Sequence, residues 1–178
     1  MASEHVLDVV VRRYVFESQR PFDAVLDGIF DGISQPDIEA LFSQLAETTS
    51  YEQFTNLIGH AQGSAGLMQF LRLDLDNAFT HDPDARDVAG RRLVRLIVGN
   101  PVTMGQMTRH VPDAGSYAPV TILIQELPGG GTRVAYDSVA SALAPYHDAD
   151  ASAVAEHLDA EVLGLLRQAT GVSVAANA

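Results

Sequence analysis

His110, Asp74 and Tyr117 are the residues of this chain whose side chains are best suited to acid–base chemistry. An imidazole or a carboxylate can accept a proton from a substrate, and a phenol can return one. We predict these three residues as catalytic candidates, with His110 or Asp74 as the base and Tyr117 or Tyr136 as the acid. The chemistry would be that of a metal-independent isomerase, lyase or cyclase.

A second set of side chains is suited to binding a small organic ligand. The guanidinium of Arg109 can hold a carboxylate through two hydrogen bonds, and the hydroxyl of Tyr136 can complete that site. Met104 and Met107 share one face of a predicted helix, where thioethers line adaptable apolar pockets. Asn100 precedes that helix, whose first amides point outward and favour an anion. We therefore expect a ligand that is partly apolar and can carry a carboxylate.

Each of these residues also has a purely structural interpretation. Asn100 can cap the helix, and the cations Arg109 and His110 can complement the helix dipole at its other end. Asp74 can form an ion pair with Arg109, buried tyrosines usually find a structural partner, and methionines usually fill the core. Because a helix rises about 1.5 Å per residue, Arg109 lies roughly 12 Å from the helix start. One small ligand therefore cannot contact both ends within one subunit.

Composition excludes several classes of protein. The chain has no cysteine, and all 11 of its basic residues are arginine, which leaves no thiolate, no Schiff-base lysine and no P-loop lysine. A net charge of −12 repels nucleic-acid phosphates and anionic membranes. The histidines lack the paired spacing of zinc motifs. We expect no metal, no cofactor, no nucleic-acid partner and no membrane association.

Length and hydropathy predict a single domain over residues 1–178, because 178 residues with 47% hydrophobic content are typical of one globular unit. No apolar run approaches the roughly 20 residues that cross a bilayer. Glu4 and Asp8 stand where a signal peptide would carry positive charge. We predict a cytoplasmic protein.

Hydrophobic spacing predicts five strands and five helices. The strands are expected at 5–16, 67–74, 93–98, 120–126 and 132–138, and the helices at 21–33, 36–45, 49–57, 101–111 and 150–170. Ser34, Thr49, Asn100 and Asp150 are the expected helix caps. This order predicts an α+β two-layer domain, with a mixed or antiparallel sheet of about five strands and helices on one face. Residues 33–62 form a helical insertion, 66–170 the core and 171–178 a flexible tail.

The centre of the chain resembles a family of small bacterial and archaeal proteins, the domain of unknown function family 302. The resemblance rests on the apolar strand that ends in Gly99-Asn100-Pro101, on the helix with Met107 to His110, and on Tyr117-Ala118-Pro119. The hairpin with Thr121 to Glu126, Gly130 and Val134 to Tyr136 belongs to the same pattern, as does the upstream stretch Gly66 to Asp74. The resemblance implies a small α+β fold that is similar to homodimers, and it implies no activity.

The leading hypothesis is a homodimeric protein that binds a small organic ligand. The motivation is that the methionines, the helix start and Arg109 lie in one segment. An acid–base enzyme that uses the region of Arg109 and His110 is the alternative. A structural or interaction protein, with residues 33–62 presenting a surface to a partner, is the second alternative.

Overall fold

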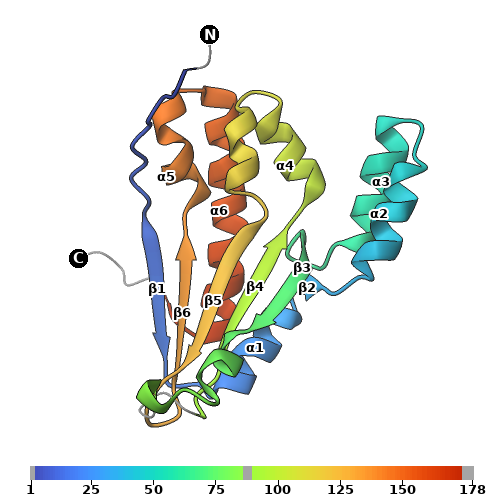
Figure 1. Ribbon diagram of the computed structural model, residues 1–178. Coiled ribbons are helices and arrows are strands. Elements are labelled where there is room, and N and C mark those ends of the chain that lie inside the picture. The colour runs from blue at the N-terminus through green and yellow to red at the C-terminus, as the bar shows by residue number, and fades with distance from the viewer. Residues whose placement is uncertain (1–2, 86–89, 174–178) are drawn as a thin grey trace.

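A computed structural model describes residues 3–85 and 90–173 of the chain. It has two layers, a six-stranded sheet and a layer of helices that covers one face of that sheet (Figure 1). No α-helix covers the centre of the other face in the part of the chain that is described. The predicted α+β class is therefore confirmed, with one strand more than the five expected.

The sheet has the order β1-β6-β5-β4-β3-β2. Its strands are β1 (Arg13–Ser18), β2 (Ile33–Ser34), β3 (Leu67–Asp74), β4 (Leu93–Gly99), β5 (Val120–Glu126) and β6 (Thr132–Asp137). All neighbouring pairs are antiparallel except β2 with β3, so the sheet is mixed. The two-residue strand β2 is the one that the sequence did not reveal, because two residues carry no measurable alternation.

Six α-helices accompany the sheet: α1 (Phe22–Phe30), α2 (Ile38–Ala46), α3 (Tyr51–Ala61), α4 (Pro101–Thr108), α5 (Val139–Leu143) and α6 (Ala149–Thr170). The long helix α6 packs against α1, α4 and α5 behind the sheet. Asp148 caps its start by accepting a hydrogen bond from the amide of Ala151, and Gly171 ends it at a positive φ of 70°.

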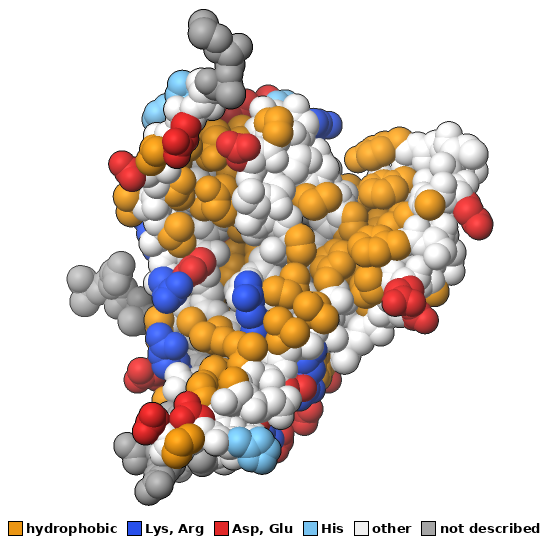
Figure 2. Space-filling view, in the orientation of Figure 1, with side chains coloured by type: hydrophobic (Ala, Val, Ile, Leu, Met, Phe, Trp, Pro, Cys, Tyr) orange, Lys and Arg blue, Asp and Glu red, His pale blue; other side chains and the backbone are white. Residues whose placement is uncertain are grey.

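The main core lies between the sheet and α6. Alternate residues of the central strands point into it, and Leu96, Ile122 and Ile124 have no exposed surface. The buried stripe of α6 faces them, with Leu158 and Val162 at its centre. This burial on one face leaves the opposite face of the same strands open, which Figure 2 shows with hydrophobic side chains and arginines side by side.

The helices α2 and α3 form the predicted insertion and project beside the β3 edge (Figure 1). A second, smaller core holds them, in which Leu41 of α2 and Ile58 of α3 enclose Met68 of β3. Phe70 of β3 and Val102 of α4 pack against the same cluster. The insertion therefore contacts both the sheet edge and the start of α4.

Several predicted boundaries and caps were wrong. The first strand begins at Arg13, because residues 5–12 form irregular chain in which Val6, Val10 and Val11 are exposed. Asp37, and not Ser34, caps α2; Ser50, and not Thr49, caps α3; and Asp148, and not Asp150, caps α6. In each case a neighbouring Asp or Ser has the required extended backbone, and residue type alone does not distinguish between neighbours.

The hairpin of β5 and β6 and the helix α4 agree with expectation, while the short helix α5 was not predicted. Of the expected tail at 171–178, residues 174–178 lie outside the described residues.

Candidate functional site

Asn100 is the side chain that joins the insertion to the rest of the fold. Its Oδ1 accepts a hydrogen bond from the amide of Val102 at 2.9 Å and so caps α4. Its Nδ2 donates to Oε1 of Gln62 at 2.7 Å and to the carbonyl oxygen of Gly66 at 2.9 Å. Gln62 follows α3 and Gly66 precedes β3, so one amide group connects α3, β3 and α4.

A cavity of about 220 Å³ opens beside this junction, between the insertion and the start of α4. Its lining is almost entirely apolar and comes from Phe42, Phe70, Asn100, Pro101, Met104 and Pro119. Asn100 is the one polar residue among them, and its side-chain amide is already occupied by protein partners. The cavity therefore offers van der Waals contact with little hydrogen bonding, which suits an apolar ligand.

Two aromatic rings form the wall that separates the insertion from the sheet. Phe42 of α2 stacks on Phe70 of β3 with ring centroids 6.2 Å apart and an interplanar angle of 26°. Nearly half of the Phe42 surface remains exposed, so the ring forms the rim of the cavity. A change in the position of α2 would therefore open or close this rim.

Gly99 sets the opposite wall. A Cβ atom at this position would lie 3.0 Å from Cβ of Pro119 and 3.1 Å from its Cα, so a larger residue would require Pro119 to move by a few tenths of an ångström. Pro119 follows Ala118 through a cis peptide bond.

The structure separates the two methionines that were predicted to bind ligand together. Met104 lines the cavity and is half-buried, whereas Met107 has no exposed surface and belongs to the main core. They lie on one helix face, three residues apart, but Met107 is enclosed by the main core whereas Met104 is only partly covered. Met107 is thus placed as core filler, which was its structural alternative.

Tyr136 is placed in a buried polar cluster, away from the cavity. Its hydroxyl donates to Oδ1 of Asp159 at 2.5 Å, and the carboxylate also accepts from the hydroxyl of Ser138 and from the amides of Val139, at 2.9 Å, and Ala140, at 3.3 Å. Burial, and then the hydrogen bond to Asp159, raise the pKa of Tyr136 above its ordinary value. A phenol held this way ties β6 to α6 and is not free to contact a ligand.

Arg109 and His110 lie together at the end of α4. The Nε of Arg109 donates to Nε2 of His110 at 3.1 Å, while Nδ1 of the same imidazole lies 3.9 Å from a carboxylate oxygen of Asp150. The nitrogen that would act as a base is therefore already occupied by Arg109. Neither residue lines the cavity at the other end of the helix.

Asp74 and Tyr117 lie at opposite ends of the sheet. Asp74 pairs with Val94 in the register and accepts hydrogen bonds from Arg72, at 2.8 Å at the closest, so the ion pair with Arg109 is not formed. Tyr117 lies near Val120 of β5, which pairs with Val98 of β4. Val98 is four residues from Val94, the partner of Asp74, so these two points of β4 are roughly 13 Å apart.

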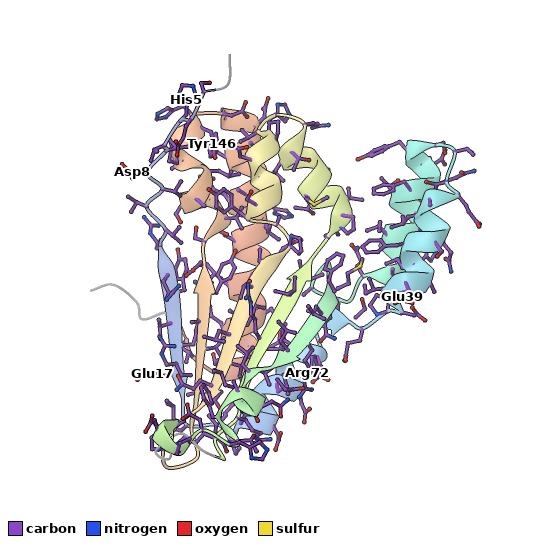
Figure 3. All side chains as sticks on the ribbon, viewed as in Figure 1. His5, Asp8, Glu17, Glu39, Arg72 and Tyr146 are labelled. Carbon is purple, nitrogen blue, oxygen red and sulfur yellow. The ribbon has the colours of Figure 1, made fainter. Side chains whose placement is uncertain are left out.

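The side chains that mark these two ends are labelled in Figure 3. Arg72 lies at the lower end of the sheet, and Tyr146, whose hydroxyl donates to Asp113 at 2.9 Å, lies at the upper end. Burial, together with hydrogen bonds to Asp113 and Tyr117, raises the pKa of Tyr146 to about 12. The three predicted catalytic side chains are therefore engaged separately and do not form a common site.

Sequence reasoning missed the aromatic walls of the cavity and the carboxylate of the buried cluster. Phe42 belongs to an apolar stripe of α2 that is wider than contact with α3 alone requires. This extra width could have indicated a second contact of α2. Phe70 does not fit the alternating pattern expected for β3, because a bulge interrupts the strand between Gln69 and Leu71. Asp159 lies on the buried stripe of α6. An aspartate among apolar positions of a helix could have indicated a buried hydrogen-bonding partner.

The fold and the site together place the chain among two-layer α+β proteins with one open sheet face and a helical insertion at its edge. It belongs to the family named Domain of unknown function DUF302, whose sequence pattern matches residues 43–169. This confirms the resemblance found in the sequence.

A crystal structure of an uncharacterized conserved DUF302 protein from Bacillus stearothermophilus has the same fold. The TM-score is 0.57 at 11% sequence identity, over 88% of this chain and 97% of that chain. No curated protein matches the sequence.

Within residues 3–85 and 90–173, no group of three or more His, Asp or Glu side chains is arranged to hold a metal ion. None of the described helices is long and apolar enough to cross a membrane.

The buried cluster of Tyr136 and Asp159 makes the free energy of unfolding change with pH in the alkaline range. Unfolded tyrosine ionises near pH 10, whereas folded Tyr136 keeps its proton, so its contribution is complete below about pH 10 and falls as the pH rises further. We predict that Tyr136→Phe lowers the free energy of unfolding by about 1–3 kcal/mol at pH 7 and that the deficit shrinks above pH 10.

Urea unfolding between pH 7 and pH 11 measures this dependence. Lysine and cysteine are absent, so tyrosines dominate the titration in that range. Tyr51→Phe, at a ring that is 66% exposed, is the control and should leave the curve unchanged. A deficit for Tyr136→Phe that stays constant with pH would contradict the assignment.

Proposed function

We propose that this protein binds a small, largely apolar organic ligand in the cavity between the insertion and α4. The observation that carries the proposal is the lining itself. Five apolar side chains from four separate segments surround one amide, that of Asn100, whose groups already bond to protein partners. Such surfaces release water readily when an apolar molecule replaces it. Of the residues expected from sequence, Asn100 and Met104 remain in this site.

A carboxylate is not well served by this cavity. Asn100 already accepts from the Val102 amide, and Arg109 lies at the far end of α4. Transfer of an unpaired charge to an apolar site is costly, so the ligand of this cavity is uncharged. The acid–base alternative gains no support, because Asp74, His110 and Tyr117 each engage a different partner.

Naphthalene is a suitable probe because it is apolar, uncharged and small enough for a cavity of about 220 Å³. We predict that it binds the wild-type protein and that Phe42→Ala weakens binding by about 1–2 kcal/mol, roughly five- to thirtyfold, through the lost ring contact. Isothermal titration and naphthalene fluorescence measure the affinity.

The matched control for this prediction is Tyr51→Ala. Tyr51 is also an exposed aromatic residue of the insertion, but it stacks on Phe54 and does not line the cavity. Equal loss of binding in both variants, or no binding to the wild type, would contradict the proposed site.

We also propose that two copies associate through the edge of β1. No described strand pairs with the outer edge of β1, and an unpaired edge is a template for another strand. The preceding chain exposes Val6 by 84% and Val10 by 83%, and Val15 on β1 is 46% exposed. A second copy that pairs antiparallel along this edge would bury these side chains and satisfy the open backbone groups.

Sedimentation velocity tests the association. We predict a species of twice the 19.1 kDa chain mass for the wild type and a monomer for the double variant Val6→Asp with Val10→Asp, because charges would be buried at the contact. Tyr51→Asp places a charge on an exposed ring of the insertion and should leave the dimer intact. A wild type that remains monomeric at every concentration would refute the interface.

A further inference from the structure

The open face of the sheet contains a second hollow, of about 390 Å³. Its floor is formed by Leu123 of β5 and Ala135 of β6, and Leu75, which follows β3, forms one lip. Arg95 of β4 and Arg133 of β6 stand on either side of that floor. The hollow is separate from the apolar cavity beside Asn100, with which it shares no lining residue.

The register of the sheet directs both arginines to the same space. Arg95 pairs with Leu123, which pairs with Ala135, so these three residues form one row across the open face. Arg133 lies two residues before Ala135 on the same strand and therefore points to the same face. Two strand spacings and one alternate-residue step place the two arginine Cα atoms roughly 12 Å apart, with the apolar floor between them.

Neither guanidinium is neutralised by a carboxylate among the described residues. Arg95 donates only to the hydroxyl of Thr121, at 3.1 Å, and Arg133 forms no side-chain hydrogen bond or ion pair in that part of the chain. By contrast, Arg13 at the rim holds Asp137 at 2.7 Å and thereby lowers the pKa of that carboxyl group. Two unpaired cations on one apolar surface are unusual for a chain with a net charge of −12.

Glu17 is an acidic residue on the strand next to Arg133. It pairs with Arg133 in the register of β1 and β6, and its exposed side chain forms no ion pair with that arginine in the described structure. Figure 3 shows it on the outer strand of the sheet. It lowers the positive potential of the hollow without occupying it.

We propose that this hollow is a binding site for an organic carboxylate with an apolar body. The planar forks of Arg95 and Arg133 match the two oxygens of a carboxylate, and the side chains of Leu123 and Ala135 offer contact for an attached ring or chain. The long arginine stems extend that apolar floor. The site is distinct from the cavity of the proposed function, which takes the uncharged ligand.

The test compares 2-naphthoate with naphthalene, two probes that share one ring system and differ by the carboxylate. Titration of 2-naphthoate is performed with saturating naphthalene, so that the apolar cavity is already filled. We expect 2-naphthoate to bind under these conditions, and more weakly at high salt because the charges are screened. The double variant Arg95→Gln with Arg133→Gln should bind at least about tenfold more weakly.

Two single substitutions sharpen the result. Glu17→Gln removes the neighbouring negative charge and should tighten 2-naphthoate binding, an effect that damage to the fold cannot produce. Arg109→Gln is the control. It removes one positive charge, as a single arginine substitution in the hollow does, but at the end of α4, and it should leave 2-naphthoate binding unchanged.

Three outcomes would overturn the proposal. They are competition between 2-naphthoate and naphthalene, unchanged binding in the double variant, and equally tight binding of inorganic phosphate, which has no apolar body. Naphthalene binding by the double variant reports that the protein is folded. If naphthalene does not bind the wild-type protein, the proposed function is contradicted but this site is not. In that case 2-naphthoate is titrated without naphthalene.

Discussion

The hydrogen bonds of Asn100 hold together the two parts of this fold that have separate hydrophobic cores. The main core is large and closed by α6, whereas the insertion has only a small cluster around Met68. Asn100 connects them because its amide reaches the residue after α3, the residue before β3 and the start of α4 at once. The cavity lies beside this junction, between Phe42 of α2 and Met104 of α4.

The open sheet face gives the molecule a second distinct surface. No α-helix among the described residues covers the centre of this face, so Arg95 is exposed and Leu123 is partly exposed, although Ala135 is itself buried. Apolar surface lies between Arg95 and Arg133, neither of which pairs with a carboxylate among the described residues. The two proposed sites therefore differ in chemistry for a structural reason, since one lies within a helical junction and the other on a bare sheet.

The elements of the core were predictable because their patterns are long and regular. The strands β3 to β6 and the helices α4 and α6 follow from apolar runs of period 2 or 3.6 that are bounded by Asn100, Pro101 and Gly171. The strand β2 has two residues and α5 has five, and neither is long enough to show a period. The caps of α2, α3 and α6 differ from expectation by a few residues, because several polar residues compete at each helix start.

The site was predictable only in part, because it depends on which faces meet. Asn100 and Met104 belong to one stretch of sequence and do line one cavity. Tyr136 and Asp74 were grouped with them by chemical type, but the sheet register sends one into a buried cluster and the other to the opposite end of the strands. The partners Phe42 and Phe70 come from distant elements, and their contact follows from a β-bulge that no local pattern indicates.

Methionine methyl NMR tests most directly the claim that Asn100 builds a ligand cavity. Met104 lines the cavity, while Met68 and Met107 are fully buried in the two cores. We predict that naphthalene shifts the Met104 methyl signal strongly and the Met107 signal little. In Asn100→Asp, which keeps the helix cap but loses both amide donors, the Met104 shift should require more naphthalene. Equal shifts at both methyl groups, or an unchanged titration in Asn100→Asp, would contradict the account.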